Sequence, residues 1–69
     1  MKNSSWIHRR NYYYKLLKDK VLVIELRKKE FFLDIYNKKK LERLHPRQFF
    51  KTLTEAFVKA SELEKGYKT

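Results

Sequence analysis

The sequence predicts an α+β domain in which an antiparallel meander of three or four strands is followed by one C-terminal helix, β-β-β-(β)-α. In residues 21–27 and again in 31–36, every second residue is apolar and the residues between them are a mixture of apolar, aromatic and charged, as in strands that bury one face. Polar segments at 18–20 and 28–30 separate these runs and predict tight turns. After Pro46 the apolar residues recur at helical spacing, so we expect a closing helix.

The strands are expected to have one covered and one open face. Residues 6–17 are aromatic and apolar and predict the first strand, and residues 41–44 are a short fourth strand or a lead-in to the helix. Alternation places on the covered face Leu22, Ile24, Leu26, Phe31, Leu33 and Ile35. The open face is expected to carry Val23, Arg27, Phe32 and Tyr36, joined by either Tyr13 and Lys15 or Tyr12 and Tyr14, depending on the register of the first strand.

The helix is expected to begin at Pro46, because proline suits the first helical position. Gln48 is then half of a capping box, and Gly66 lies where a left-handed C-cap is expected. The apolar stripe consists of Phe49, Leu53, Ala56, Phe57, Ala60 and Leu63. The apolar side chains beyond the stripe, with the small size of the chain, predict a homodimer whose interface includes Phe50, Phe57 and Val58.

Length and composition predict one domain at residues 6–66, with a flexible N-terminus at 1–5 and a tail at 67–69. The chain has no cysteine, which excludes disulfides and thiolate metal ligands. The first ten residues lack the apolar run of a signal peptide, and the longest apolar stretch, 21–24, is far shorter than a membrane span. We therefore expect a cytoplasmic or nucleoid-associated protein without a membrane partner.

The net charge of +10 is unevenly distributed along the chain. Residues 1–51 contain fifteen Lys and Arg against five Asp and Glu, whereas residues 52–69 contain three Lys and three Glu. A genome biased toward AT-rich codons also raises the lysine content, but it does not explain a neutral last quarter. Such an asymmetry is the usual signature of a surface that binds a polyanion.

Catalysis finds little support in the sequence. His8 and His45 are far apart in the sequence, and there is no cysteine to complete a zinc site. Gly66 is the only glycine, so the chain cannot form a glycine-rich phosphate-binding loop. Glu25 and Asp34 are better explained by cross-strand ion pairs with Arg27 or a lysine than by acid–base chemistry. We therefore expect a protein that is not an enzyme and has no catalytic residues, no cofactor and no metal.

The basic and aromatic residues together predict a nucleic-acid-binding face. Basic clusters at 8–10, 27–29 and 38–40 fall at strand ends or in loops, where they can contact phosphates around the open face. The interleaved rings offer stacking surfaces for unpaired bases, although simple packing explains them equally well. The candidate binding residues are Arg9, Arg10, Tyr13, Lys15, Arg27, Lys28, Lys29, Phe32, Tyr36, Lys38, Lys39 and Lys40.

Residues 12–57 resemble the positive-cofactor-four type of transcriptional coactivators, which have a Whirly-like fold. The likeness rests on an aromatic first strand, on the run Lys-Val-Leu-Val-Ile-Glu-Leu-Arg at 20–27, and on Leu-His-Pro-Arg-Gln-Phe at 44–49. The chain departs from the family pattern at Leu41, which replaces a glycine, and at His45, which replaces Ser or Thr. The resemblance implies a dimer built through the helices that binds single-stranded DNA between paired sheets.

We therefore expect a non-catalytic protein that binds single-stranded nucleic acid, DNA or RNA with DNA favoured, in transcription, replication or recombination. Two alternatives stay open. In the first alternative, the sheet binds double-stranded DNA in the major groove. Arg, Asn and Gln side chains recognise the base edges there better than aromatic rings do. In the second alternative, the protein is a small inhibitor or adaptor of a phage type, and its basic face binds an acidic protein.

Overall fold

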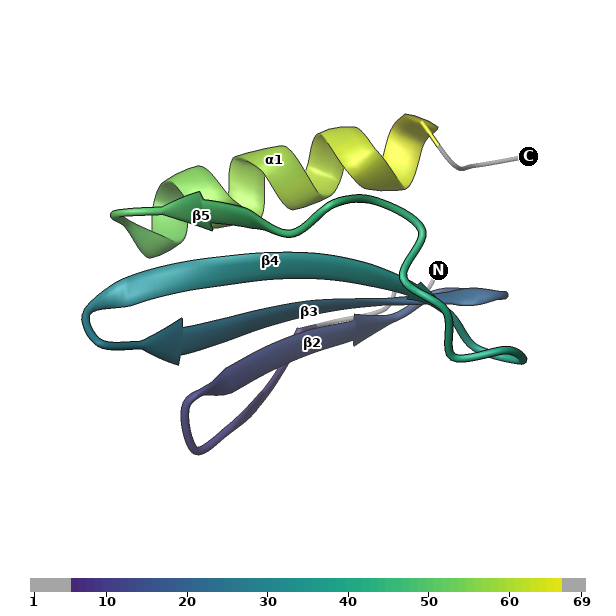
Figure 1. Cartoon of the computed structure of the whole chain (residues 1–69), viewed down its shortest axis with the longest axis horizontal. Helices are drawn as coiled ribbons and strands as arrows, with labels where there is room; N and C mark the ends of the chain where they lie inside the picture. Colours follow the sequence, from purple (N-terminus) through teal and green to yellow (C-terminus); the bar gives the residue numbers. More distant parts are fainter. Residues whose placement is uncertain (1–5, 67–69) are drawn as a thin grey trace.

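The computed structural model describes residues 6–66, which form one antiparallel sheet with a helix packed across one of its faces (Figure 1). In the described residues the sheet has five strands in sequential order, β1 to β5, followed by α1. The elements are β1 (Ile7–Arg9), β2 (Tyr12–Leu16), β3 (Lys20–Arg27), β4 (Glu30–Asn37), β5 (Gln48–Phe50) and α1 (Leu53–Gly66). The α+β class, a meander followed by one C-terminal helix, is confirmed. The flexible end and the tail expected at 1–5 and 67–69 lie outside the described residues.

The region expected to hold the first strand is a hairpin of two strands, because the chain turns at Arg10 and Asn11. Arg10 has a φ of 54°, a conformation that hairpin turns require and that a polar residue tolerates better than a β-branched one. The Asn11 side chain donates from Nδ2 to the carbonyl oxygen of Leu26 at 2.9 Å, and the Leu26 amide donates to the Asn11 carbonyl at 2.8 Å. These bonds fix the turn against β3.

The register of β2 against β3 decides which tyrosines reach the open face. Tyr13 pairs with Ile24 and therefore shares the side of the sheet that the helix covers. Tyr12 pairs with Glu25, on the opposite side. Of the two registers that the sequence allowed, the structure therefore has the one that puts Tyr12 and Tyr14 on the open face.

The helix begins at Leu53, and the expected start at Pro46 is wrong. The hydroxyl of Thr52 accepts a hydrogen bond from the Glu55 amide at 3.2 Å, which is the first half of a Thr-x-x-Glu capping box. Residues 48–50, expected to be helical, instead pair with 31–33 of β4. This pairing satisfies backbone groups along the exposed edge of β4, which outweighs the helix-start preference of Pro46.

Three smaller expectations near the helix also change. Phe49 belongs to β5 and not to the helical stripe. Residues 41–44 form no strand but a single bridge, between Arg43 and Tyr36. Gly66 has no positive φ and ends the helix as an ordinary helical residue, so the expected left-handed cap is wrong.

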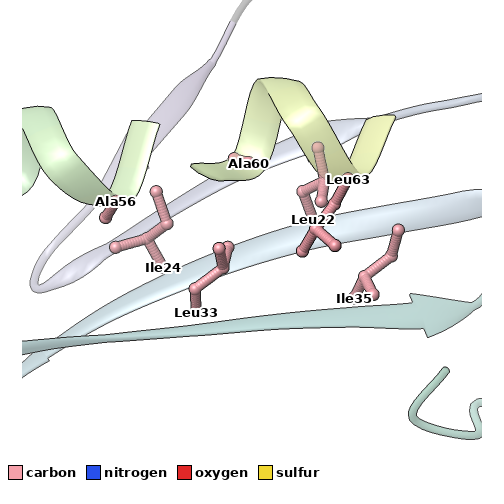
Figure 2. Close-up of a cluster of buried hydrophobic side chains, with 7 residues drawn as sticks. All are labelled: Leu22, Ile24, Leu33, Ile35, Ala56, Ala60 and Leu63. Atoms are coloured by element: carbon pink, nitrogen blue, oxygen red, sulfur yellow. The ribbon is translucent and has the colours of Figure 1, made fainter. Parts of the chain in front are cut away.

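The core lies between α1 and the central strands (Figure 2). Its buried side chains come from β3, β4 and the helix: Leu22, Ile24, Leu33, Ile35, Ala56, Ala60 and Leu63. Ala56 and Ala60 let the helix approach the sheet closely, because they present only a methyl group to it. The four buried strand residues and the three buried helix residues all belong to the sets predicted from alternation and from the helical stripe.

Aromatic rings close the side of the core near β1 and β2. Phe57 packs on Trp6 with ring centres 4.9 Å apart and meets Tyr13 edge-on at 5.8 Å. Phe50 also packs against the core, whereas Val58 is 55% exposed. Phe50 and Phe57, two of the three expected dimer-interface residues, therefore pack against the core of the same chain. No helix of the described chain is long and apolar enough to cross a membrane.

Candidate nucleic-acid interface

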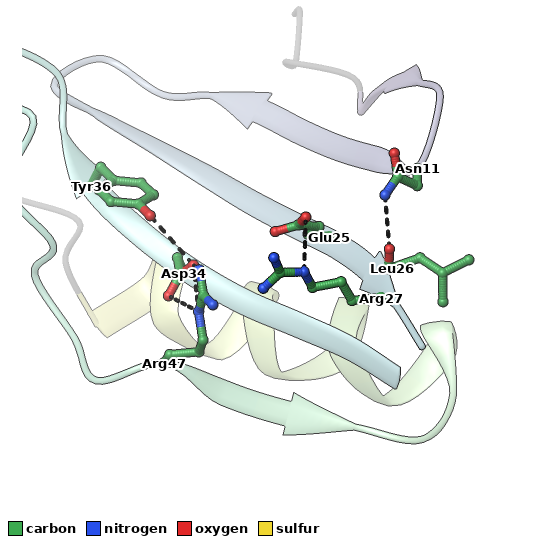
Figure 3. A network of polar contacts seen from close by, with 7 residues as sticks. All are labelled: Asn11, Glu25, Leu26, Arg27, Asp34, Tyr36 and Arg47. Carbon is green, nitrogen blue, oxygen red and sulfur yellow. Dashed lines mark hydrogen bonds and ion pairs between the residues drawn. The ribbon is translucent and has the colours of Figure 1, made fainter. Parts of the chain in front are cut away.

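The side of the sheet opposite α1 is the candidate site, and we call it the open face (Figure 3). Alternation and register define its members on β2 to β5 as Tyr12, Tyr14, Val23, Glu25, Arg27, Phe32, Asp34, Tyr36 and Phe49. Figure 3 shows Glu25, Arg27, Asp34 and Tyr36 on the side of the sheet away from the helix. The predicted open-face positions of Val23, Arg27, Phe32 and Tyr36 are thus confirmed.

Basic residues lie at both ends of this face. The turns at 10–11 and 28–29 stand at the same end, because Asn11 is bonded to Leu26 next to the β3–β4 hairpin. At the other end, the Asn37 side chain accepts from the amides of Lys39 and Lys40 at 2.9 and 3.0 Å and so shapes the turn at 38–40. Eight strand residues separate the two ends, which is about 26 Å at 3.3 Å per residue.

The candidate cations are exposed at both ends. Arg9, Arg10, Arg27, Lys28, Lys29, Lys38, Lys39 and Lys40 all reach solvent. Arg27 lies 3.7 Å from Glu25 two residues earlier on β3, so the ion pair that was expected across strands lies within one strand. Arg27 also lines an open hollow with Lys28, Glu30 and Phe32. The Arg27 side chain is 58% exposed, so its ion pair with Glu25 is weak. The sequence therefore identified the basic clusters at both ends of the face.

Tyr13 and Lys15 are corrections to the candidate set, since both lie on the covered face. Tyr13 stacks on His8 of β1 with ring centres 4.1 Å apart and meets Phe57 of α1 edge-on at 5.8 Å. The Lys15 ammonium lies 3.0 Å from Oε1 of Glu64 and ties β2 to the helix. Both side chains therefore connect the two layers of the protein and do not face a ligand on the open side.

The predicted stacking rings, Phe32 and Tyr36, lie beneath arginine side chains. The guanidinium carbon of Arg47 is 5.3 Å from the ring centre of Phe32, and that of Arg43 is 5.9 Å from the ring centre of Tyr36. Both rings are half-buried. The exposed large rings of the open face are Tyr12 at 42% and Phe49 at 65%, and Phe49 meets Phe32 edge-on at 5.2 Å.

A buried carboxylate holds these arginines in place. Asp34 is only 4% exposed, and Arg47 donates to its Oδ2 from Nη2 at 2.9 Å and from Nε at 3.1 Å (Figure 3). Arg43 lies with Nε 3.2 Å from Oδ1, and the Tyr36 hydroxyl donates to Oδ2 at 3.4 Å. The hydrogen bonds to Asp34 raise the pKa of the Arg47 guanidinium further above its usual range.

The sequence prediction missed Phe49, Arg43 and Arg47. Phe49 was assigned to the helix, which hid its place beside Phe32. The arginines lie in a segment without regular alternation, so their position over the sheet depends on the path of the chain between β4 and β5. One signal was present: Asp34 stands between two aromatic residues of the same strand face, where an unpaired carboxylate is costly and needs cationic partners.

The two histidines have local partners. Nε2 of His8 donates to the Arg10 carbonyl at 2.9 Å, and Nδ1 of His45 donates to the Pro46 carbonyl at 3.1 Å. Across residues 6–66, no three His, Cys, Asp or Glu side chains gather in a way that suits a metal ion.

Comparison of the chain with protein-family models, with curated proteins and with solved structures finds no match. The class that the structure defines is thus a small α+β protein with an arginine- and aromatic-rich sheet face.

Proposed function

We propose that this protein binds single-stranded nucleic acid, with DNA favoured over RNA, on the open face of its sheet, and that it does so without catalysis. The observation that supports this most is the placement of exposed cations at both ends of one sheet face, with aromatic rings between them. The helix α1, by contrast, contains two Lys and three Glu and offers no comparable group of cations.

The two kinds of residue have different tasks in this proposal. Lysines at 28–29 and 38–40 contact the sugar–phosphate backbone, which gives affinity for any sequence. Exposed rings such as Phe49 and Tyr12 stack on unpaired bases, at about 1–3 kcal/mol for each base. Single-stranded nucleic acid satisfies both demands, because its bases are accessible. This function fits a role in transcription, replication or recombination and agrees with the resemblance to the positive-cofactor-four type of protein.

The width of the sheet is a reason to prefer a single strand over a duplex. Five strands spaced by 4.8 Å span about 19 Å between the outer backbones. The major groove of B-DNA is about 12 Å wide and admits a helix or a two-stranded ribbon. A sheet as wide as this one therefore rests on the rims of the groove and does not enter it.

A homodimer remains part of the proposal, with a reduced interface. Val58 is the expected interface residue that the fold leaves exposed, since Phe50 and Phe57 pack on the protein's own core. Sedimentation equilibrium of the wild type and of Val58→Lys tests it: twice the chain mass for the wild type and a lower mass for the variant are expected. A monomeric wild type contradicts the dimer but leaves the open face intact.

The test of function is a fluorescence titration with an oligothymidylate of about twelve nucleotides, a duplex of equal length and the matching RNA, each at about 50 and 200 mM salt. We expect the single strands to bind more tightly than the duplex. With roughly four phosphates contacted, log K against log salt for a single strand is expected to slope near −3. Equal or tighter duplex binding favours the duplex reader, and salt-independent or absent binding points to an acidic protein partner.

A further inference from the structure

The arrangement of Arg43, Arg47 and Asp34 at the centre of the open face suggests a specific site. Two guanidinium groups share one carboxylate, so the cluster retains one uncompensated positive charge. Both arginine side chains reach solvent, at 45% and 30% exposed, while the carboxylate between them is buried. A ligand that approaches the open face therefore meets the arginines and not Asp34.

The contacts to Asp34 fix the direction of both guanidinium groups. They use Nε and Nη2 of Arg47 and Nε of Arg43, which leaves the remaining N–H donors of the two side chains to point elsewhere. An arginine held in this way loses little conformational entropy when it binds an anion, unlike a lysine on an exposed turn. Planar guanidinium groups also match the geometry of phosphate oxygens.

Aromatic rings lie on either side of Asp34, and one exposed ring lies beside them. Phe32 and Tyr36 each lie two residues from Asp34 on the same face of β4, which is about 7 Å along the strand in either direction. Phe49 extends the Phe32 position with an exposed ring. Along β4 the order is ring, carboxylate, ring, and the guanidinium groups of Arg47 and Arg43 lie over Phe32 and Tyr36, so the exposed ring beside the arginine pair is that of Phe49.

We infer that Arg43 and Arg47, oriented by Asp34, bind one backbone phosphate, and that one of the two bases joined by this phosphate lies over the exposed ring of Phe49. This inference rests on the proposed function and deepens it, because it assigns one phosphate to a fixed site and the others to the exposed lysines at the ends. The chemical class of ligand is a phosphodiester flanked by two unpaired bases.

The first test uses the wild-type protein and the smallest ligand of this class, the dinucleotide TpT. Nitrogen–proton NMR spectra of the arginine Nε groups are recorded during titration with TpT and with its neutral methylphosphonate analogue. We expect TpT to shift the Nε signals of Arg43 and Arg47 saturably, with the analogue leaving them nearly unchanged. Equal shifts with both ligands, or shifts confined to arginines such as Arg9 and Arg10, overturn the inference.

The second test compares Arg43→Gln with Lys39→Gln, which removes the same charge from an exposed turn. Arg43 is chosen because Arg47 still pairs with the buried carboxylate in its absence. For an oligothymidylate of about twelve nucleotides we expect a loss of about tenfold for Arg43→Gln and about twofold for Lys39→Gln. Equal losses in the two variants overturn the fixed site.

The two tests separate the inference from the proposed function. A wild type that binds the oligothymidylate but shows no preference for TpT over its neutral analogue retains the proposed function and loses the phosphate site. A wild type that binds no oligonucleotide loses both. Because the NMR titration needs no variant, a destabilised Arg43→Gln does not prevent the decision.

Discussion

The two faces of the sheet are formed by alternate residues of the same strands, yet they are held together by different forces. On β4, Leu33 and Ile35 are at most 1% exposed against the helix, while Asp34 between them faces the other way and is buried by arginines. The covered face is stabilised by loss of apolar surface from water, which needs no particular partner. The open face depends on an ion-pair network, which needs specific partners at specific places.

The largest expected effect tests the covered face. Leu33→Ala removes a buried side chain from the centre of the core, and we expect it to lower the free energy of unfolding by about 3 kcal/mol. A domain of this size has a total stability of roughly 3–10 kcal/mol, so the variant is expected to be close to unfolded at elevated temperature. Urea denaturation followed by circular dichroism measures the change.

The matched control for this substitution is Val23→Ala, on the neighbouring strand and the opposite face. Val23 is only half-buried, so we expect a cost of less than about 1 kcal/mol. A cost as large as that of Leu33→Ala would mean that the open face is a second apolar interface, covered in solution by another molecule.

The next effect tests the network of the open face. Asp34→Asn removes the charge that orients both arginines, and we expect a loss of about 2 kcal/mol in unfolding free energy. This is less than the cost of breaking a fully buried pair, because the arginines are partly exposed and regain water. Glu25→Gln is the control, and we expect it to cost less than about 0.5 kcal/mol since its partner Arg27 is exposed. Similar melting temperatures for both variants and the wild type would contradict a structural role for the network.

The difference between the faces also explains what the sequence could predict. Alternation predicted the buried strand residues such as Leu22 and Ile24, because a two-residue period and a helical stripe follow from geometry alone. The turn at 28–29 and the basic ends followed from the same pattern. The open-face assignment of Phe32 and Tyr36 was confirmed for the same reason.

The network and the fifth strand could not be derived in this way. Arg43 and Arg47 lie where the chain has no period, and their position follows from the pairing of β5 with β4. That pairing was missed because Pro46 and Gln48 were interpreted as the start of the helix. The Thr52 and Glu55 pattern, a capping box visible in the sequence, would have placed the helix start correctly and left 48–50 available for a strand.

A smaller effect concerns ligand binding. Phe49→Ala removes an exposed ring from the edge of the sheet, and we expect a loss of about 1–3 kcal/mol in affinity for single-stranded DNA. Its unfolding free energy is expected to change by less than about 1 kcal/mol, because the ring is mostly in water. Phe32→Ala is the comparison: it is expected to lower both affinity and stability, since that ring supports Arg47 and Phe49. Titration and thermal melting of both variants measure the two quantities, and unchanged affinity in Phe49→Ala would contradict stacking at this edge.

The smallest expected effect has the opposite sign and concerns the turn between β3 and β4. Lys28 and Lys29 have φ values of 47° and 66°, which a two-residue hairpin turn of this kind requires and which Asn-Gly adopts with less strain. We therefore expect Lys28→Asn combined with Lys29→Gly to stabilise the protein by about 1 kcal/mol. The same double variant loses two charges at one end of the open face, so its affinity for single-stranded DNA is expected to fall and its salt slope to flatten by up to about 1.4.

The control for the turn is Lys39→Gly, because Lys39 lies in an exposed turn but has no positive φ. It is expected to weaken binding in the same way without stabilising the fold. We expect a gain in stability only in the turn variant and a loss of affinity in both variants. That result would show that the charges of the lysines at 28–29 serve binding although their backbone conformation is unfavourable for lysine. A turn variant that is no more stable than Lys39→Gly would mean that these lysines carry no conformational cost, and their position would then be no argument for a binding role.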